Sequence, residues 1–292
     1  MSAGPIIRLE RLRELWIHTG TACNLSCPFC HEGSKPGDER LQAPTLAELA
    51  PRLDEAAALG VDRFAFTGGE PLILKGILEI LLHALQLKPV LVLTNGTAPF
   101  IRRAHQLATL RTALHALSFR VSIDSPEEAL HDAGRGLKNF RKALEGLKLL
   151  HDAGFAVSIA RQQQDAEDAP AIARKFQQLL RRHGLPADVP VVAIPQLGSL
   201  EAPRCLPDLA EGPWPTEPLC AQGRMLIRRA GSLRLTACPL VDDDPAFDAP
   251  PDLKQAGCSA VETVHRRCTL CRGVGVGYID TVARPRYNAG DS

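Results

Sequence analysis

Leu15-Trp16-Ile17-His18-Thr19 leads almost directly into Cys23-Asn24-Leu25-Ser26-Cys27-Pro28-Phe29-Cys30, and the fold is built around this pair of segments. The first segment is rich in β-branched and aromatic residues and is predicted to be a strand. The second segment holds three thiols in eight residues. Thiolate ligands select iron–sulfur clusters, zinc or copper(I). The loop after the first predicted strand is therefore a candidate metal site.

The three cysteines lack an obvious fourth protein ligand. A structural zinc site uses four ligands, and the nearest candidate is His31. This residue follows Cys30 directly and has little freedom to bend back onto the same metal. A [4Fe–4S] cluster held by Cys23, Cys27 and Cys30 would leave one iron open for a ligand that is not protein. The spacing favours such a cluster, while a zinc site and buried free thiols remain alternatives.

Composition excludes several classes of protein. The 292 residues allow one large domain, with or without an appendage. A formal net charge of +1, an aromatic content of 4% and the lack of a dense Lys/Arg cluster argue against nucleic-acid binding. No apolar run reaches the roughly 18 residues of a membrane span, and the N-terminus lacks an apolar signal core. We expect a cytoplasmic protein whose nine cysteines stay reduced and serve as ligands or catalysts.

Six β-rich runs alternate with helical segments along the first two thirds of the chain. The predicted strands cover residues 15–19, 63–67, 90–94, 117–124, 155–160 and 189–194. The predicted helices cover about 45–60, 76–87, 99–110, 137–153 and 170–183. Thr45 and Glu48 form a capping-box pattern for the first helix, although Pro51 could instead mark its first turn. Apolar strands with right-handed helical crossovers predict an α/β fold, a partial (β/α)6 barrel.

Unusual motifs follow five of the predicted strands. Ligands of parallel sheets bind at the carboxyl ends of the strands, so these motifs are expected to meet at one site. In strand order they are the cysteine loop, Gly68-Gly69-Glu70-Pro71, Thr94-Asn95-Gly96, Asp124-Ser125 and Arg161.

The cysteine spacing and Gly68-Gly69-Glu70-Pro71 resemble the radical S-adenosylmethionine (SAM) superfamily, over residues from about 13 to 200. The resemblance implies that Cys23, Cys27 and Cys30 ligate a [4Fe–4S] cluster whose open iron chelates the amino and carboxylate groups of SAM. It also implies that Phe29 fills the family's aromatic position, with the backbone around Phe29 and His31 near the adenine. Gly68, Gly69 and Glu70 are implied to receive the ammonium group. Glycine suits close backbone approach to a ligand, and a carboxylate suits an ammonium. An ordinary strand-end turn is the alternative for the glycine motif.

Further SAM contacts implied by the resemblance rest on less specific residues. Asn95 matches the polar end of the third strand, and Ser122 and Asp124 are placed for the ribose or the carboxylate. Arg161 is a cation suited to a carboxylate. A surface salt bridge or a solvated strand end is the alternative for each. Three residues near the sixth strand either line the adenine or belong to the core: Ile194, Pro195 and Leu197.

The chain changes character between residues 200 and 218, where five prolines occur without an apolar period. We predict a domain boundary here, with residues 1–199 as the core and residues 200–292 as a linker plus a small Cys-rich extension. Residues 225–236 predict a β-hairpin that turns at Gly231-Ser232. Four thiols from the hairpin and the tail would form a closed zinc or [4Fe–4S] site: Cys220, Cys238, Cys268 and Cys271.

Behind a radical SAM core, this extension resembles the twitch domain, the shortened form of the SPASM extension, which implies one auxiliary [4Fe–4S] cluster. A zinc ribbon is the alternative. The later cysteine run of a full SPASM domain is missing, because no cysteine follows Cys271. Cys258 could replace one of the four ligands. Cys205 could face the substrate, although a buried inert thiol is the simpler interpretation.

These features predict an enzyme that reductively cleaves SAM to a 5′-deoxyadenosyl radical, which abstracts hydrogen from a small alcohol or a peptide side chain. A fully ligated second cluster would take an electron from the substrate radical and complete a two-electron oxidation. An external donor such as flavodoxin or ferredoxin is expected. No catalytic residue is predicted, since the spacing of His18, Glu32 and Glu201 does not distinguish them from surface residues.

Two other functions fit the sequence. One is a ribosomal-peptide maturase that forms a crosslink or an epimer with the help of a leader-binding partner protein. The other is a zinc-binding module without enzymatic activity. Iron content distinguishes the second from an enzyme, because zinc without iron would exclude cluster chemistry.

Overall fold

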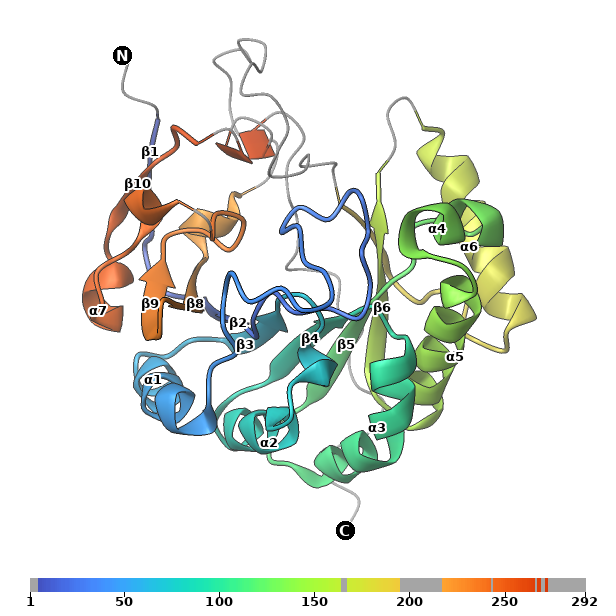
Figure 1. The fold of residues 1–292 in the computed structure, drawn as a ribbon, viewed down its shortest axis with the longest axis horizontal. Helices are drawn as coiled ribbons and strands as arrows, with labels where there is room; N and C mark the ends of the chain where they lie inside the picture. Colours follow the sequence, from blue (N-terminus) through green and yellow to red (C-terminus); the bar gives the residue numbers. More distant parts are fainter. Residues whose placement is uncertain are drawn as a thin grey trace.

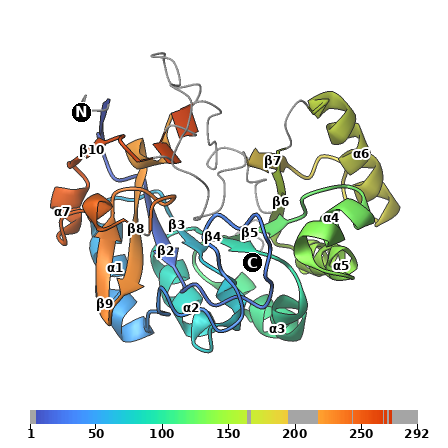
Figure 2. The same ribbon diagram turned by 45° about the horizontal axis from the view of Figure 1, so that its top comes forward.

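The computed structural model describes residues 5–163, 167–194, 217–242, 244–265, 267–268 and 271–272. Eight strands form one sheet in the order β7-β6-β5-β4-β3-β2-β8-β9, and only β8 and β9 pair antiparallel. The strands are β2 (Glu14–His18), β3 (Arg63–Thr67), β4 (Val90–Thr94), β5 (Leu117–Ser122), β6 (Ala156–Gln162), β7 (Val191–Ile194), β8 (Gly223–Arg229) and β9 (Ser232–Thr236). Within the described residues, β7 and β9 are the two edges, so the sheet is an open arc (Figure 2).

Helices follow the strands in the order that the sequence predicts. They are α1 (Leu46–Ala58), α2 (Ile77–Leu87), α3 (Ala98–Ala108), α4 (Glu128–Arg135), α5 (Asn139–Asp152), α6 (Ala169–Arg182) and the short α7 (Leu253–Ala256). Single 3₁₀ turns cover Pro71–Ile73, Thr109–Thr112, Leu219–Ala221 and Pro245–Phe247. Figure 1 shows α1, α2, α3 and α5 around the outside of the arc, with the loop after β2 lying within it. None of the helices in the described part of the chain has the length and apolar character to span a membrane.

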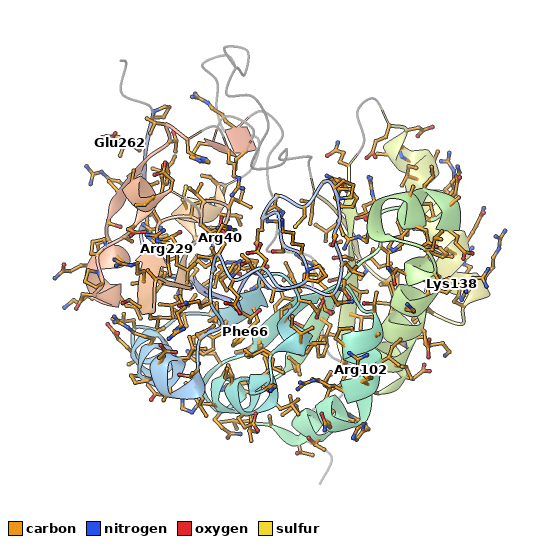
Figure 3. The ribbon with its side chains drawn as sticks, in the orientation of Figure 1. Arg40, Phe66, Arg102, Lys138, Arg229 and Glu262 are labelled. Atoms are coloured by element: carbon orange, nitrogen blue, oxygen red, sulfur yellow. The ribbon has the colours of Figure 1, made fainter. Side chains whose placement is uncertain are left out.

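Strand side chains alternate between the helix-covered face of the sheet and its inner face. Phe64 and Phe66 of β3 are fully buried with helix residues in the main core, and Figure 3 labels Phe66 between the sheet and the helices. Ala65, between them, belongs to a second cluster on the inner face. On β5 the same alternation places Phe119 in the main core, whereas the neighbouring Arg120 donates to the Ser158 hydroxyl of β6 at 3.2 Å. The inner face is therefore partly polar.

The predicted partial (β/α)6 barrel is confirmed as a curved, mainly parallel α/β sheet. Each predicted strand lies within about two residues of an observed one. Thr45 and Glu48 form both hydrogen bonds of a capping box, so α1 begins before Pro51, which lies inside the helix.

The predicted helix over residues 137–153 was wrong at its start. Leu137 lies outside the helix with 85% of its surface exposed, and α5 begins at Asn139. Lys138 separates α5 from the unpredicted helix α4 by adopting a left-handed conformation with φ of 65°. An apolar residue at helical spacing therefore belonged to the turn between two helices.

The C-terminal segment continues the sheet. Strand β8 pairs in parallel with β2 through the register Glu14↔Gly223 to Ile17↔Leu226. A separate two-stranded sheet joins β1 (Ile6–Arg8) antiparallel to β10 (Ala260–Glu262), so the first described strand is tied to the C-terminal segment (Figure 1). The β8–β9 hairpin turns at Ala230 and Gly231, which have φ of 49° and 76°. The hairpin was predicted, but its turn lies one residue earlier than Gly231-Ser232.

Candidate active site

A cavity of about 160 Å³ opens at the carboxyl ends of the central strands. Its walls bring together polar, apolar and thiol groups from the loop after β2 and from the ends of β3 to β7. The walls include Cys23, Cys27, Phe29, Cys30, Gly68, Gly69, Asn95, Ser122, Asp124, Arg135, Arg161 and Ile194. The predicted convergence of strand-end motifs is present, because each of the five strand-end motifs contributes to this wall.

The three N-terminal thiols lie in a tightly turned loop. The Cys30 amide donates to the Cys27 carbonyl at 3.1 Å, and the Gly33 amide donates to the Cys30 carbonyl at 3.0 Å. Partial burial, with smaller contributions from the Glu70 carboxylate and the thiols of Cys27 and Cys30, raises the pKa of the Cys23 thiol to about 12. Burial also raises the pKa of Cys27 and of Cys30. The three half-buried thiols therefore share one environment that favours the protonated form unless a cation compensates their charge.

The Gly68-Gly69 turn packs against the backbone that leads to the cysteines. The Gly69 amide donates to the Gly20 carbonyl at 2.9 Å, and the Glu70 amide donates to the Ala22 carbonyl at 3.1 Å. Gly68 has φ of 137°, which favours glycine. A methyl group on Gly69 would overlap the Ala22 carbonyl. The two glycines are therefore required by close approach to the protein's own backbone, besides any approach to a ligand.

Glu70 is buried, and it is not among the described residues that line the cavity. Its carboxylate accepts hydrogen bonds from the Thr94 hydroxyl at 2.8 Å, the Asn95 amide at 2.8 Å and the Leu72 amide at 3.1 Å. Burial raises the pKa of Glu70, and these three hydrogen bonds oppose that rise. In this arrangement the carboxylate joins the ends of β3 and β4. The implied contact with an ammonium group stays a prediction.

Asn95 connects the end of β4 to the cysteine loop. Its side-chain amide donates to Asn24 Oδ1 at 2.9 Å and to Cys23 Sγ at 3.9 Å. Its side-chain oxygen accepts from the Thr97 hydroxyl at 2.6 Å. The predicted site residue Asn95 thus lies at a candidate ligand, and it orients the first cysteine of the loop.

Arg135 of α4 is a cavity residue that the sequence did not reveal. Its guanidinium makes a two-point ion pair with Asp124, with Nη2 3.0 Å from Oδ1, and its Cζ atom lies 5.5 Å from the centre of the Phe29 ring. Burial alone would lower the pKa of Arg135, but the adjacent Asp124 raises it, so the guanidinium stays charged. Gly134 leaves room for the Phe29 ring, which a methyl group there would overlap. In the sequence, Arg135 could be recognised only as an arginine eleven residues after Asp124, and this separation is not part of a known motif.

Arg161 lies in the cavity wall but already has a partner. It forms a two-point ion pair with Glu167 at 2.5 and 2.7 Å, and both side chains are 8% exposed. The alternative of a salt bridge, raised for Arg161 from the sequence, is thus present, in a buried form.

The remaining predicted residues fall into two groups. Ser122 and Ile194 line the cavity. Four others lie outside the described residues: Pro195, Leu197, Glu201 and Cys205.

The four C-terminal thiols form a second group. Cys220, Cys238, Cys268 and Cys271 are all buried and line one small cavity. Burial raises the pKa of Cys220, and the charges of the other three thiols contribute to the rise. Burial also raises the pKa of Cys268 to about 12. Cys258 is exposed and does not line this cavity, so it is not positioned to replace one of the four.

The fold and the site define a class of protein. It is an open, parallel α/β sheet in which a loop after the first strand of the parallel series presents three thiols to a cavity at the strand ends. Residues 17–161, about half of the chain, match the Radical SAM superfamily. The chain belongs to this superfamily, and membership implies SAM and a [4Fe–4S] cluster as cofactors. The second thiol group lies outside the matched residues.

The chain is similar to proteins with different stated roles. The antilisterial bacteriocin subtilosin biosynthesis protein AlbA of Bacillus subtilis is 34% identical over 140 residues, covering 47% of this chain and 30% of AlbA. A probable GTP 3′,8-cyclase of Methanopyrus kandleri is 37% identical over 88 residues, covering 30% of this chain and 28% of the cyclase. The match therefore spans less than a third of either relative.

A solved structure supports the fold. Streptococcus suis SuiB bound to S-adenosylmethionine superposes with a TM-score of 0.52 at 16% identity, covering 64% of this chain and 41% of SuiB. At this level of identity the likeness concerns the fold alone.

Proposed function

We propose that this chain holds a [4Fe–4S] cluster on Cys23, Cys27 and Cys30 and binds SAM in the adjoining cavity, as a radical SAM enzyme. The observation that carries the proposal is the opening of three half-buried thiols onto one cavity at the strand ends. The donor set fits this cofactor, because three thiolates complete three irons and leave the fourth open. Cluster binding would also compensate the buried thiolate charge.

Protein groups around the cavity suit the parts of SAM. Arg135 and Ser122 offer a cation and a hydroxyl for the carboxylate or the ribose. Arg161 offers a second cation in the same wall, and each arginine is already paired with one carboxylate, Arg135 with Asp124 and Arg161 with Glu167. Phe29 offers an aromatic edge near the third cysteine. Asp124 already holds Arg135, so it fixes the direction of the guanidinium. When bound and reduced, the cluster supplies the electron that cleaves SAM into methionine and a 5′-deoxyadenosyl radical. The proposed source of that electron is an external donor such as flavodoxin or ferredoxin.

The second thiol group is proposed to hold one further [4Fe–4S] cluster, as the twitch-like interpretation predicts. Four thiolates around one zinc at about 2.3 Å lie roughly 3.8 Å apart. Among the described residues, no three thiols have sulfur atoms that are all within 4.8 Å of one another. This wider spacing favours a cluster over a single zinc ion. A cluster with four protein ligands suits electron transfer, which supports oxidation of the substrate as the overall reaction.

The proposed substrate is a peptide. The similarity to a bacteriocin biosynthesis protein favours a ribosomal-peptide maturase over an enzyme for a small alcohol. The similarity to a GTP 3′,8-cyclase makes GTP the second candidate, although that match covers only 30% of this chain. Adding GTP to the reduced protein with SAM distinguishes the two, because a cyclised nucleotide product would favour the second candidate.

Reductive SAM cleavage tests the proposed activity. Anaerobically reconstituted protein with dithionite and SAM should release 5′-deoxyadenosine, and Cys30→Ala should release none above background. Cys258→Ala is the matched control, since this thiol is exposed and outside both groups, and it should retain the parental rate. Parental activity in Cys30→Ala would overturn the assignment of the site.

A further inference from the structure

A buried group of charged residues lies between the two thiol sites. We call it the inter-site cluster, and it comprises His18, Glu32, Arg40, Asp242 and Arg267. All but Arg40 are at most 3% exposed. Figure 3 labels Arg40 where the loop after β2 meets the C-terminal segment. The inter-site cluster therefore joins the two parts of the chain that carry the cysteines.

Arg267 makes direct contacts toward both thiol sites. Its guanidinium donates from Nη2 to the carbonyl of His31, the residue that follows Cys30. Nη1 donates to the carbonyl of Leu240, whose amide in turn lies 3.4 Å from Cys238 Sγ. Arg267 also directly precedes Cys268 in the sequence. One buried side chain thus bonds to the backbone beside a cysteine of each group.

Asp242 and Arg40 complete the connection. Asp242 lies 3.5 Å from Arg267 Nη1 and 2.8 Å from Arg40 Nη2. Arg40 Nη2 also donates to the Glu32 carbonyl at 3.1 Å. Asp242 is therefore connected to the cysteine loop through Arg40 as well as through Arg267. A buried carboxylate between two guanidinium groups is held firmly, because leaving either charge unpaired is costly.

The inter-site cluster does not favour a metal ion, although His18, Glu32 and Asp242 place ligand atoms within 4.8 Å of one another. His18 Nε2 lies 2.6 Å from Glu32 Oε2, and the two arginines supply the positive charge beside Asp242. A divalent cation would have to displace these contacts or share a small space with two guanidinium groups.

We infer that Arg267 is a positioning residue that couples the two thiol sites, by fixing the Cys30–His31 backbone relative to the Cys238–Leu240 backbone. Only one consequence of this inference rests on the proposed function, namely that Arg267 holds two clusters at a fixed separation. The planar guanidinium is suited to this role because it donates in two directions at once, which a lysine or an amide of similar length does not. A substitution of Arg267 should therefore change the position and the protection of Cys30, on the other side of the interface between the two segments.

The first test uses the protein without iron. Site-resolved alkylation by iodoacetamide, read by mass spectrometry, measures how well each thiol is protected. Arg267→Gln should raise the alkylation rate of Cys30 at least several-fold relative to Cys258, the exposed internal reference. Arg267→Lys retains the charge without the two-way donor geometry, and it should raise the rate of Cys30 as well. If Arg267→Gln does not fold, Arg267→Lys provides the same test.

Arg224→Gln is the matched control. Arg224 is also fully buried, and it donates to the Cys220 carbonyl at 2.7 Å and to the Ser259 carbonyl at 2.9 Å, without a recorded contact to the cysteine loop among the described residues. This variant should expose Cys220 without changing the ratio of Cys30 to Cys258. Equal effects of both substitutions on Cys30, or an unchanged Cys30 in both folded Arg267 variants, would overturn the inference.

The second test uses the reconstituted protein and measures reduction potentials rather than turnover. Arg267→Gln should shift the potentials assigned to both thiol sites, whereas Arg224→Gln should shift only the second. A shift confined to the second site in Arg267→Gln would contradict the coupling. If the chain binds no iron at all, the proposed function fails, but the alkylation test still decides whether Arg267 couples the two segments.

Discussion

Single residues at the site act mostly by fixing the backbone that carries the thiols. Gly68 and Gly69 bring the end of β3 against residues 20–22, and Glu70 and Asn95 extend this contact to β4 and Cys23. The loop after β2 is thus held along its length by hydrogen bonds, before any cofactor is considered. Cofactor binding at such a site needs little reorganisation, because its ligands are already placed.

Gly69→Ala tests this backbone contact. The new methyl group would overlap the Ala22 carbonyl, so we expect a loss of about 1–3 kcal/mol of stability and lower iron retention. Urea unfolding and iron analysis measure both. Gly76→Ala is the control, because a methyl group there meets only the end of the Glu79 side chain at 3.9 Å. Equal stability of the two variants would refute the account of the glycine motif.

His131 gives the site a dependence on pH. Burial and the charge of the nearby Arg135 together lower the pKa of His131 to about 4. Its Nδ1 accepts from the Asp124 amide at 3.2 Å, as the neutral ring requires. The unfolded chain binds this proton more tightly, so stability should fall as the pH drops from about 6.5 towards 4.

His131→Asn should flatten this fall, by up to about 2 kcal/mol between pH 7 and pH 5. Urea unfolding at the two pH values measures the difference. His105→Asn, at an exposed position of α3, controls for the loss of an imidazole. A slope in His131→Asn as steep as in the parent protein would show that this histidine does not cause the fall.

The sequence predicted the first thiol group because its three cysteines lie within eight residues, whose spacing carries the chemistry. The second group is spread from Cys220 to Cys271, and it was predicted from the hairpin, the Cys268–Cys271 pair and the resemblance to a twitch domain. The sequence missed Arg135 because that residue depends on α4, an eight-residue helix with no predicted boundary. The sequence predicted that Arg161 contacts SAM, because a residue at a strand end is expected to lie near the site. It did not predict that Glu167 would pair with the Arg161 guanidinium.

Among the elements, the β8–β9 hairpin differs most from what the sequence suggested. Apolar alternation predicted its strands, but nothing local predicts that β8 pairs in parallel with β2, which lies more than 200 residues earlier in the chain. The pairing places Met225 and Ile227 in one cluster with Trp16 and with the second thiol group. The hairpin therefore positions the extension's cysteines from the edge of the main sheet.

Ala230→Asn should stabilise this hairpin. Two residues with positive φ form the turn, and asparagine followed by glycine is the preferred pair for such a turn. Replacing the strained alanine should increase the unfolding free energy by about 0.5–1 kcal/mol. Gly231→Ala should have the opposite effect, since it puts a side chain on the second positive-φ position. Urea denaturation of both variants checks the prediction, and a destabilised Ala230→Asn would contradict it.

At the scale of the whole molecule, the two predicted domains share one sheet and one charged interface. The boundary at residue 199 lies outside the described residues and stays a prediction. Strand β2, which precedes the cysteine loop, has β3 on one side and β8 on the other. Both thiol sites therefore depend on a strand arrangement that neither segment completes alone.

Truncation after residue 199 tests this dependence. Removing β8 exposes the backbone edge of β2 and the apolar surface beneath Met225 and Ile227, both fully buried. We expect an aggregating protein, or one without a cooperative unfolding transition, by size-exclusion chromatography and calorimetry. A monomeric fragment that unfolds cooperatively would show that residues 1–199 fold independently.

The central claim is that two separate thiol groups each hold one cluster, and that only the first binds SAM. The most direct measurement is iron content with low-temperature electron paramagnetic resonance, with and without SAM. The account predicts about eight iron atoms per chain, and about four in both Cys30→Ala and Cys268→Ala. SAM should perturb the signal that survives in Cys268→Ala, and leave the signal of Cys30→Ala unchanged. Zinc without iron in the parent protein, or a SAM-responsive signal in Cys30→Ala, would contradict the account.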